Sequence, residues 1–293
     1  MSRDPAFRAL ELLRVGRAAE AADIARIALT ETPDDELSRR VLVAALIELD
    51  RADDAVEIAE VGCRLRPSSG QINAARALAL RHANRPLEAV EAAETAIRLD
   101  PDQPDHAIEY AKSLLAASRW TPRPAELKRS LLTRATQTAD AAIATSPTSP
   151  DAHVVRGAVA LEGGDFATAE RSAMKALHLD PELPSAHQLA GLAKAKRRQL
   201  LDASDHFVHA GRLDTRSSTS IEMLDEVSSS PGWWGVAIMG AAIPVLSALD
   251  GSFNTWMLVP AAGGVAGMLW LRFAPTRRLS AEAKAAKRRA RRL

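Results

Sequence analysis

The feature that most constrains the fold of this chain is a proline that returns at nearly fixed intervals. Prolines follow helix-like segments at Pro33, Pro67, Pro101, Pro147 and Pro181. Three of the four intervals span about 34 residues, and the interval before Pro147 is longer. A sixth copy follows in the same register, and it ends at Thr215 in place of a proline. A fixed period of about 20 to 50 residues is typical of solenoids, in which each copy packs on its neighbours.

Small residues precede each proline by twelve, eight and five positions. The first five copies have Ala21, Ala25 and Ala28; Ala55, Ala59 and Gly62; Ala89, Ala93 and Ala96; Ala135, Ala139 and Ala142; and Ala169, Ala173 and Ala176. Spacings of four and three residues place each triplet on one face of a helix. We therefore expect the second helix of each copy to lie close to its neighbours along this face.

A turn separates the two helices of each copy. Gly16 and Gly164 begin a Gly-x-x-x-x-Ala sequence, and Asp50 and Asn84 replace the glycine in two other copies. Asp and Asn tolerate turn geometry, so the replacement fits. Period, stripe and turn together resemble the tetratricopeptide repeat (TPR), a helix-turn-helix unit of about 34 residues. The resemblance covers residues 1–215 and implies an all-α fold, a right-handed TPR α-solenoid of about six repeats. A generic Ala-rich bundle is the alternative, but it has no reason to keep this period.

Two departures from the family pattern lead to further expectations. The large aromatic residue early in the first helix is mostly absent, and its place holds Pro5, Arg39, Asn73, His153 and His187. This predicts loosely packed first helices. The fourth copy is longer, which we interpret as a Pro-rich turn near Pro122 and a second helix that protrudes about three turns. Trp120 lies at its base, where packing on its own helix is favoured over contact with a partner.

The TPR resemblance also implies that the first helices line a concave groove in which partners bind. The corresponding groove residues are Leu10, Leu13, Arg40, Ala44, Ile47, Leu78, Arg81, Ile108, Lys112, Leu115, Val154, Leu161, Gln188 and Leu192. One branch of the family grips a carboxylate with Lys, Asn and Arg at these places, and the largely apolar set here does not support that clamp. An apolar groove suits an amphipathic helix or an apolar extended peptide. Alternatively, the superhelix fills part of this surface by closing on itself.

The character of the chain changes after residue 215. Residues 216–231 are Ser-rich and read as a linker, and residues 232–249 and 253–271 contain no charged side chain. Each uncharged run is long enough to span a bilayer, and tryptophans lie near their ends, as in membrane interfaces. We therefore predict a two-helix transmembrane hairpin over 232–273, in which Gly263 and Gly267 offer a close-packing face.

A basic tail over 274–293 completes the predicted organisation. Residues 272–293 hold nine Arg or Lys and one Glu, whereas the whole chain has a net charge of +1. By the positive-inside rule this end is cytoplasmic, and two crossings place the N-terminus there too. The first residues lack an apolar run, so no signal peptide is expected. These points predict a multi-pass cell-membrane protein with both termini in the cytoplasm. The tail lacks interleaved aromatic residues, which argues against nucleic acid as the partner.

No motif in the sequence indicates catalysis. A Gly-rich phosphate loop and a His-Glu-x-x-His helix are absent, and the single cysteine, Cys63, reads as a small buried residue. His206 and His209 lie one turn apart near Asp202 and Asp205, which is a weak metal pattern and more typical of surface residues. We therefore expect no enzyme activity, no catalytic residues, no cofactor and no bound metal.

These observations predict a membrane-tethered TPR scaffold or adaptor. Its partner would be a protein or peptide bound in the concave groove on the cytoplasmic side, and a lipid membrane would hold the anchor. The alternative is an integral subunit or assembly factor of a membrane protein complex, which acts through the transmembrane hairpin.

Overall fold

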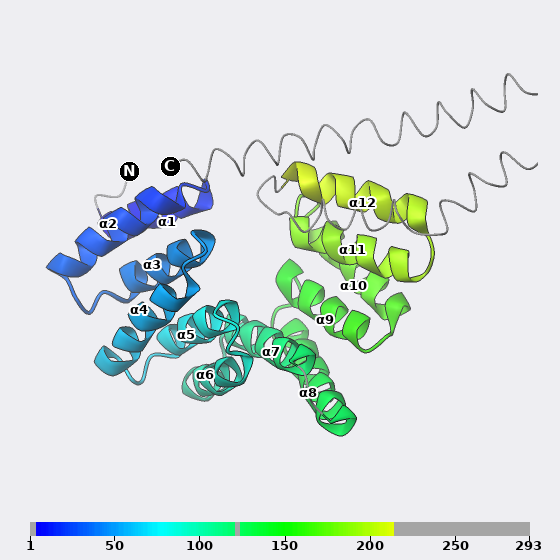
Figure 1. The fold of residues 1–293 in the computed structure, drawn as a ribbon, viewed down its shortest axis with the longest axis horizontal. Helices are drawn as coiled ribbons and strands as arrows, with labels where there is room; N and C mark the ends of the chain where they lie inside the picture. The colour runs from blue at the N-terminus through cyan, green and yellow to red at the C-terminus, as the bar shows by residue number, and fades with distance from the viewer. Residues whose placement is uncertain (1–3, 121–123, 214–293) are drawn as a thin grey trace, which may run out of the picture. The chain divides into compact units, whose positions relative to one another are not determined.

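The computed structural model describes residues 4–120 and 124–213, and every regular element in this part is an α-helix (Figure 1). The helices are α1 (Pro5–Arg14), α2 (Ala18–Glu31), α3 (Glu36–Glu48), α4 (Ala52–Leu65), α5 (Gly70–His82), α6 (Pro86–Leu99), α7 (Pro104–Arg119), α8 (Ala125–Thr145), α9 (Pro150–Glu162), α10 (Phe166–Leu179), α11 (Pro184–Lys196) and α12 (Leu200–Leu213). The predicted all-α class is confirmed for these residues. The predicted linker, transmembrane hairpin and tail lie outside them.

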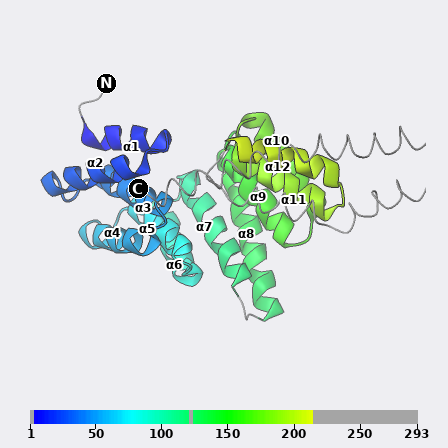
Figure 2. The same ribbon diagram turned by 45° about the horizontal axis from the view of Figure 1, so that its top comes forward.

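Two compact units make up the described chain. The first ends at Gly164, and the second begins at Asp165. Within the first unit each helix packs on the next one along the chain, and the first helices of neighbouring repeats, α1, α3, α5, α7 and α9, also contact one another. Figures 1 and 2 both show the hairpins α1–α2, α3–α4 and α5–α6 side by side. This neighbour-to-neighbour packing is the architecture that the repeat period predicts.

The turn residues adopt the left-handed backbone that the sequence indicated. Gly16, Asp50 and Asn84 have φ values of 73°, 61° and 59°, and they recur once in each of the first three repeats. Gly164 has a φ of 85°, and Arg198, one period later, has a φ of 63°. Left-handed backbone is routine for Gly and accessible to Asn and Asp, whereas other residues adopt it at a cost. The turn prediction is therefore confirmed, with Arg198 as an added and less favourable case.

The small-residue stripe lies in the core. All members of the five predicted triplets are buried, and Ala203, Phe207 and Ala210 continue the stripe in α12. At Gly62 an added Cβ would lie 2.5 Å from Cδ of Arg39 and 2.9 Å from Cγ2 of Ile72. This close approach leaves no free volume for a larger side chain at the end of α4.

The first helices are not loosely packed, which corrects the expectation from the missing aromatic residue. Arg39, Asn73, His153 and His187 are buried polar side chains. Arg39 donates a hydrogen bond to the Pro33 carbonyl. Nε2 of His153 and of His187 donates to the carbonyl of Pro147 and of Pro181, each at 3.1 Å. A buried polar group is stable when it is hydrogen-bonded in this way, so these side chains tie each first helix to the preceding turn.

The insertion in the fourth repeat lengthens the hairpin α7–α8. Helix α8 has 21 residues against 14 in α6, which corresponds to about two extra turns rather than the three expected. Figure 2 shows α8 alongside α7. The first turns of α8 are exposed, and Trp120 at the base is 41% exposed. Glu162 of α9 accepts hydrogen bonds from Arg119 at 2.8 Å and Lys128 at 2.6 Å, which fastens the base of the hairpin to the next repeat.

The second unit is described over α10, α11 and α12. Phe207 of α12 is fully buried, and its ring would lie 2.6 Å from a Cβ added to Gly191 of α11. Three imidazoles gather beside it: Nδ1 of His187 lies 3.2 Å from Nδ1 of His206, and the rings of His187 and His209 are stacked at 5.1 Å. Because Nε2 of His187 carries the proton donated to Pro181, its Nδ1 accepts the hydrogen bond from His206.

Candidate peptide-binding groove

A cavity of about 440 Å³ lies on the first-helix face of the first unit. It is lined by residues from α1, α3, α5 and α7, with Gln103 immediately before α7. The lining residues are Leu10, Leu13, Arg14, Leu37, Arg40, Val41, Ala44, Gln71, Ala74, Ala75, Leu78, Gln103, Asp105, His106 and Glu109. We call this cavity the groove. Its volume is in the range of sites that take small ligands or side chains.

The floor of the groove is apolar because of the repeat pattern. Leu10, Ala44 and Leu78 occupy equivalent places in three successive repeats, and all three are partly exposed. Ala74 and Ala75 of α5 also line the groove, and their side chains are small. Partly exposed leucines around a hollow are a surface that a partner's apolar side chains would cover favourably.

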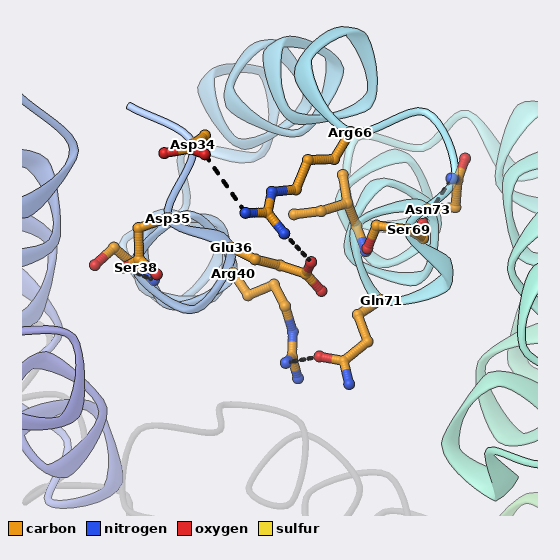
Figure 3. A network of polar contacts seen from close by, with 10 residues as sticks. Asp34, Asp35, Glu36, Ser38, Arg40, Arg66, Ser69, Gln71 and Asn73 are labelled. Atoms are coloured by element: carbon orange, nitrogen blue, oxygen red, sulfur yellow. Dashed lines mark hydrogen bonds and ion pairs between the residues drawn. The ribbon is translucent and has the colours of Figure 1, made fainter. Parts of the chain in front are cut away.

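Polar groups border this floor, and their contacts differ from one another. Arg40 of α3 donates to the side-chain oxygen of Gln71 in α5 (Figure 3). Arg81 donates to Glu109 at 3.0 Å, and both side chains are largely buried. Nδ1 of His106 donates to the Asp100 carbonyl at 3.2 Å. Thus the positive charge of Arg81 is neutralised inside the protein, whereas Arg40 is held by a neutral amide.

A second set of polar contacts lies at the helix ends of repeats two and three. Arg66, which follows α4, lies 3.5 Å from Asp34 and 3.7 Å from Glu36 (Figure 3). Ser69 caps α5 through a hydrogen bond from the Ile72 amide at 3.1 Å. The ion pairs join the end of repeat two to its start, and the Ser69 cap holds the first turn of α5, from which Gln71 projects.

The structure brings some of the sequence-predicted groove residues together and separates others. Leu10, Leu13, Arg40, Ala44 and Leu78 line the groove. Ile47, Arg81, Lys112, Val154 and Leu161 belong to the same unit but do not line it. Ile108 and Leu115 are buried in the core at 5% and 7% exposure, because α7 packs between α5, α8 and α9. Gln188 and Leu192 lie in the second unit, in α11.

Sequence reasoning missed the lining residues that lie nearer the start of each first helix. Leu37, Gln71 and Asp105 are each one repeat period apart, as are Val41, Ala75 and Glu109. The period that identified the repeats therefore also carries the signal for these positions. Leu37, Gln71 and Asp105 lie in the first turn of their helices, about one turn before predicted positions such as Arg40. Val41, Ala75 and Glu109 directly follow those positions, so the groove extends to the N-terminal ends of α3, α5 and α7.

The residues that the sequence considered for a metal site or a reactive thiol can be located in the described structure. Among residues 4–120 and 124–213, no group of three or more His, Cys, Asp and Glu side chains is arranged to hold a metal ion. His206 and His209, which the sequence paired, both contact His187. Burial raises the pKa of the Cys63 thiol, which opposes formation of a reactive thiolate.

Solved structures with the same fold are TPR proteins. The chain is similar to a thermophilic TPR protein of Thermus thermophilus (19% identity, TM-score 0.58, 65% of this chain and 96% of that one). It is also similar to a TPR protein of Parabacteroides merdae (13% identity, TM-score 0.62, 77% and 83%) and to PilW, a type IV pilus biogenesis factor (18%, 0.56, 77% and 97%). No protein-family model and no curated protein matches the chain.

Likeness at this identity shows the fold, and the described part of the chain therefore has the TPR solenoid fold. Helix length and apolar character provide a separate test for membrane crossing. Within the residues that the structure describes, no helix is both long enough and apolar enough to cross a bilayer.

Proposed function

We propose that this protein is a scaffold that binds a protein or peptide partner in the groove and is held at a membrane by residues 232–273. The observation that carries the proposal is the groove itself, an apolar hollow built by the first helices of four consecutive repeats. TPR solenoids present such a face because each repeat adds one first helix to it. The absence of catalytic motifs in the sequence agrees with a binding role.

The apolar floor favours a partner segment that presents apolar side chains from one face. An amphipathic helix does this at spacings of three and four residues, and an extended peptide does it at every second residue. Leu10, Ala44 and Leu78 together would cover such side chains and remove them from water. Binding at several repeats at once would also fix the direction of the segment along the solenoid.

The test compares two glutamate substitutions in the full-length chain. Leu78→Glu places a charge on the groove floor, whereas Leu87→Glu places one at a position of α6 that is 47% exposed. Proteins that co-purify with wild type from the native host should be lost with Leu78→Glu and kept with Leu87→Glu. Circular dichroism must show equal helix content in both. Equal co-purification with both variants would contradict binding in the groove.

The membrane anchor requires its own test because it rests on the sequence. Full-length protein should stay with membranes after alkaline extraction, and protease added outside spheroplasts should leave both termini uncut. Replacing Gly263 and Gly267 with Leu separates an anchor from an assembly device. Loss of the partner with membrane insertion intact would favour the alternative, in which the hairpin binds another membrane protein.

A further inference from the structure

We infer that the groove binds a segment of mixed charge: an acidic side chain next to Arg40, a basic side chain next to Asp105, and apolar residues between them. The inference rests on the proposed function and specifies the chemistry of the partner. The two charged residues stand on different helices, Arg40 on α3 and Asp105 on α7, and both line the groove. Between them lie the small residues of α5, Ala74 and Ala75.

Arg40 is a half-buried cation without a carboxylate partner in the described part of the chain. Its guanidinium donates to the Gln71 side chain, which is neutral. The other N–H groups of the guanidinium fork remain for a ligand that approaches through the groove. A carboxylate is the group that this planar fork binds best, because two parallel charge-assisted hydrogen bonds form at once.

The neighbouring arginines show that Arg40 is a distinct case. Arg66 is paired with Asp34 and Glu36, and Arg81 is paired with Glu109. Asp34, Glu36 and Glu109 are thus used by these two arginines. Among the residues that the structure describes, no carboxylate forms an ion pair with Arg40, so a partner carboxylate there would meet a positive charge that is not neutralised.

Asp105 is the anionic counterpart of Arg40 in the lining of the groove. Glu109 is neutralised by Arg81, and Asp105 forms no ion pair within the described residues. Asp105 is exposed in the first turn of α7. Its equivalents one and two periods earlier are Gln71 and Leu37, so the negative charge appears at this position in the fourth repeat and not in the two before it. A Lys or Arg side chain of the partner would complement it.

The lining at the centre of the groove determines which partner residues lie between the acidic and the basic one. Ala44, Ala74 and Ala75 leave room for partner side chains, and Leu10 and Leu78 provide apolar contact beside them. A segment whose charges were close together in sequence would have to leave this floor uncovered. The occupant is therefore a protein segment with an acidic end, an apolar middle and a basic end.

The experiment uses a random twelve-residue peptide library displayed on phage and the full-length chain in detergent micelles. Wild type should enrich peptides with Asp or Glu on one side of an apolar core and Lys or Arg on the other. An enriched peptide is then synthesised, and its affinity for each variant is measured by fluorescence anisotropy. Arg40→Glu and Asp105→Lys should each weaken binding about tenfold, and a peptide with the facing charge reversed should recover it. Arg98→Glu and Asp102→Lys, which are exposed outside the groove, are the matched controls.

Each outcome decides between this inference and the proposed function. If Leu78→Glu abolishes binding but both charge reversals leave it unchanged, the groove binds peptides and the mixed-charge inference is wrong. If the enriched peptides lack the paired charges, the inference is also wrong. If no peptide is enriched, or if enriched peptides bind Leu78→Glu as well as wild type, both the proposed function and the inference fail.

Discussion

The hairpins α5–α6 and α11–α12 solve the same packing problem with different residues. In α5–α6, the contact between the two helices is compared at one position on each helix: Ala77 on α5 and Ala93 on α6. Both side chains are fully buried. In α11–α12 the same positions, three repeats later, hold Gly191 and Phe207, and the phenylalanine ring fills the space over the glycine. The repeat therefore does not fix the residue types at this contact. Two small side chains are buried in one hairpin, and a large ring packed over a glycine is buried in the other.

The largest expected effect comes from removing the ring in the second unit. Phe207→Ala leaves a cavity over Gly191, and we expect it to lower the free energy of opening α12 by about 3–5 kcal/mol. Hydrogen exchange of peptides over 200–213 in the full-length chain should accelerate accordingly. Met174→Ala, at a position of α10 that is 48% exposed, is the control and should change exchange little. Slow exchange in the Phe207 variant would show that the ring is not needed for packing.

A phenylalanine placed at the equivalent position of the first unit tests the same comparison. Ala93→Phe places the ring opposite Ala77 rather than a glycine, and overpacking should destabilise the α5–α6 hairpin by about 1–3 kcal/mol. Adding Ala77→Gly should recover part of this loss, because it recreates the combination found in α11–α12. The exchange rates over residues 70–99 measure both variants. A double variant that is less stable than the single one would contradict the idea that the ring needs a glycine opposite it.

Protonation should loosen the second unit through its imidazole cluster. Burial lowers the pKa of His187, and burial together with the nearby His187, Lys194 and His209 lowers that of His206, against a smaller opposite effect of Asp205. Because both folded-state values lie below the ordinary value near 6.5, the unfolded state binds more protons. The stabilisation is complete above that pH and declines as pH falls through the folded-state values. Protonation also removes the acceptor at Nδ1 of His187.

The measurement is hydrogen exchange over 200–213 at pH 7.5 and pH 5.5, corrected for the intrinsic pH dependence of exchange. Protection should decrease at the lower pH in wild type. In His206→Gln the decrease should be smaller, since one of the two imidazoles with a lowered pKa is gone. A decrease of the same size in the variant would show that His206 contributes nothing to the pH dependence.

The smallest effect concerns the turns. Arg198 adopts a φ of 63° where the first unit uses Gly16, Asp50 and Asn84. Arg198→Gly should stabilise the α11–α12 hairpin by about 0.5–1 kcal/mol, because glycine adopts this backbone without steric cost. Gly16→Ala should destabilise α1–α2 by about 1 kcal/mol for the converse reason. Thermal unfolding followed by circular dichroism reports both, and a stabilising Gly16→Ala would contradict the assignment of backbone strain.

The fold could be predicted from sequence because its signals are local and repeated. Period, small-residue stripe and turn residues each depend on neighbours along the chain, and Asp50 and Asn84 could be placed in turns from their chemistry alone. The packing of the first helices could not, because the side chains of Arg39 and His153 reach carbonyls six residues earlier in the preceding turn. These contacts depend on how the preceding turn folds back. The absence of the aromatic residue that the family has at this position gives no information about that turn.

Only part of the groove lining was predicted, because helical register along the chain does not reveal the contacts between helices. Helical register identified Leu10, Ala44 and Leu78, which line it. It also selected Ile108 and Leu115, which are buried in the core where α7 packs on its neighbouring helices. Ion pairs between helices, such as Arg81 with Glu109, decide which charges remain for a partner, and they depend on the twist between neighbouring repeats.

Site-specific photo-crosslinking in the native host tests the central claim most directly. A photoreactive amino acid is placed at Ala74, inside the groove, or at Leu87, on the exposed surface of α6, in otherwise wild-type full-length protein. A partner held in the groove predicts a discrete crosslinked species at Ala74 that is absent at Leu87 and is lost when Leu78→Glu is added. Crosslinks of equal yield at the two positions, or a species at Ala74 that persists with Leu78→Glu, would contradict the account.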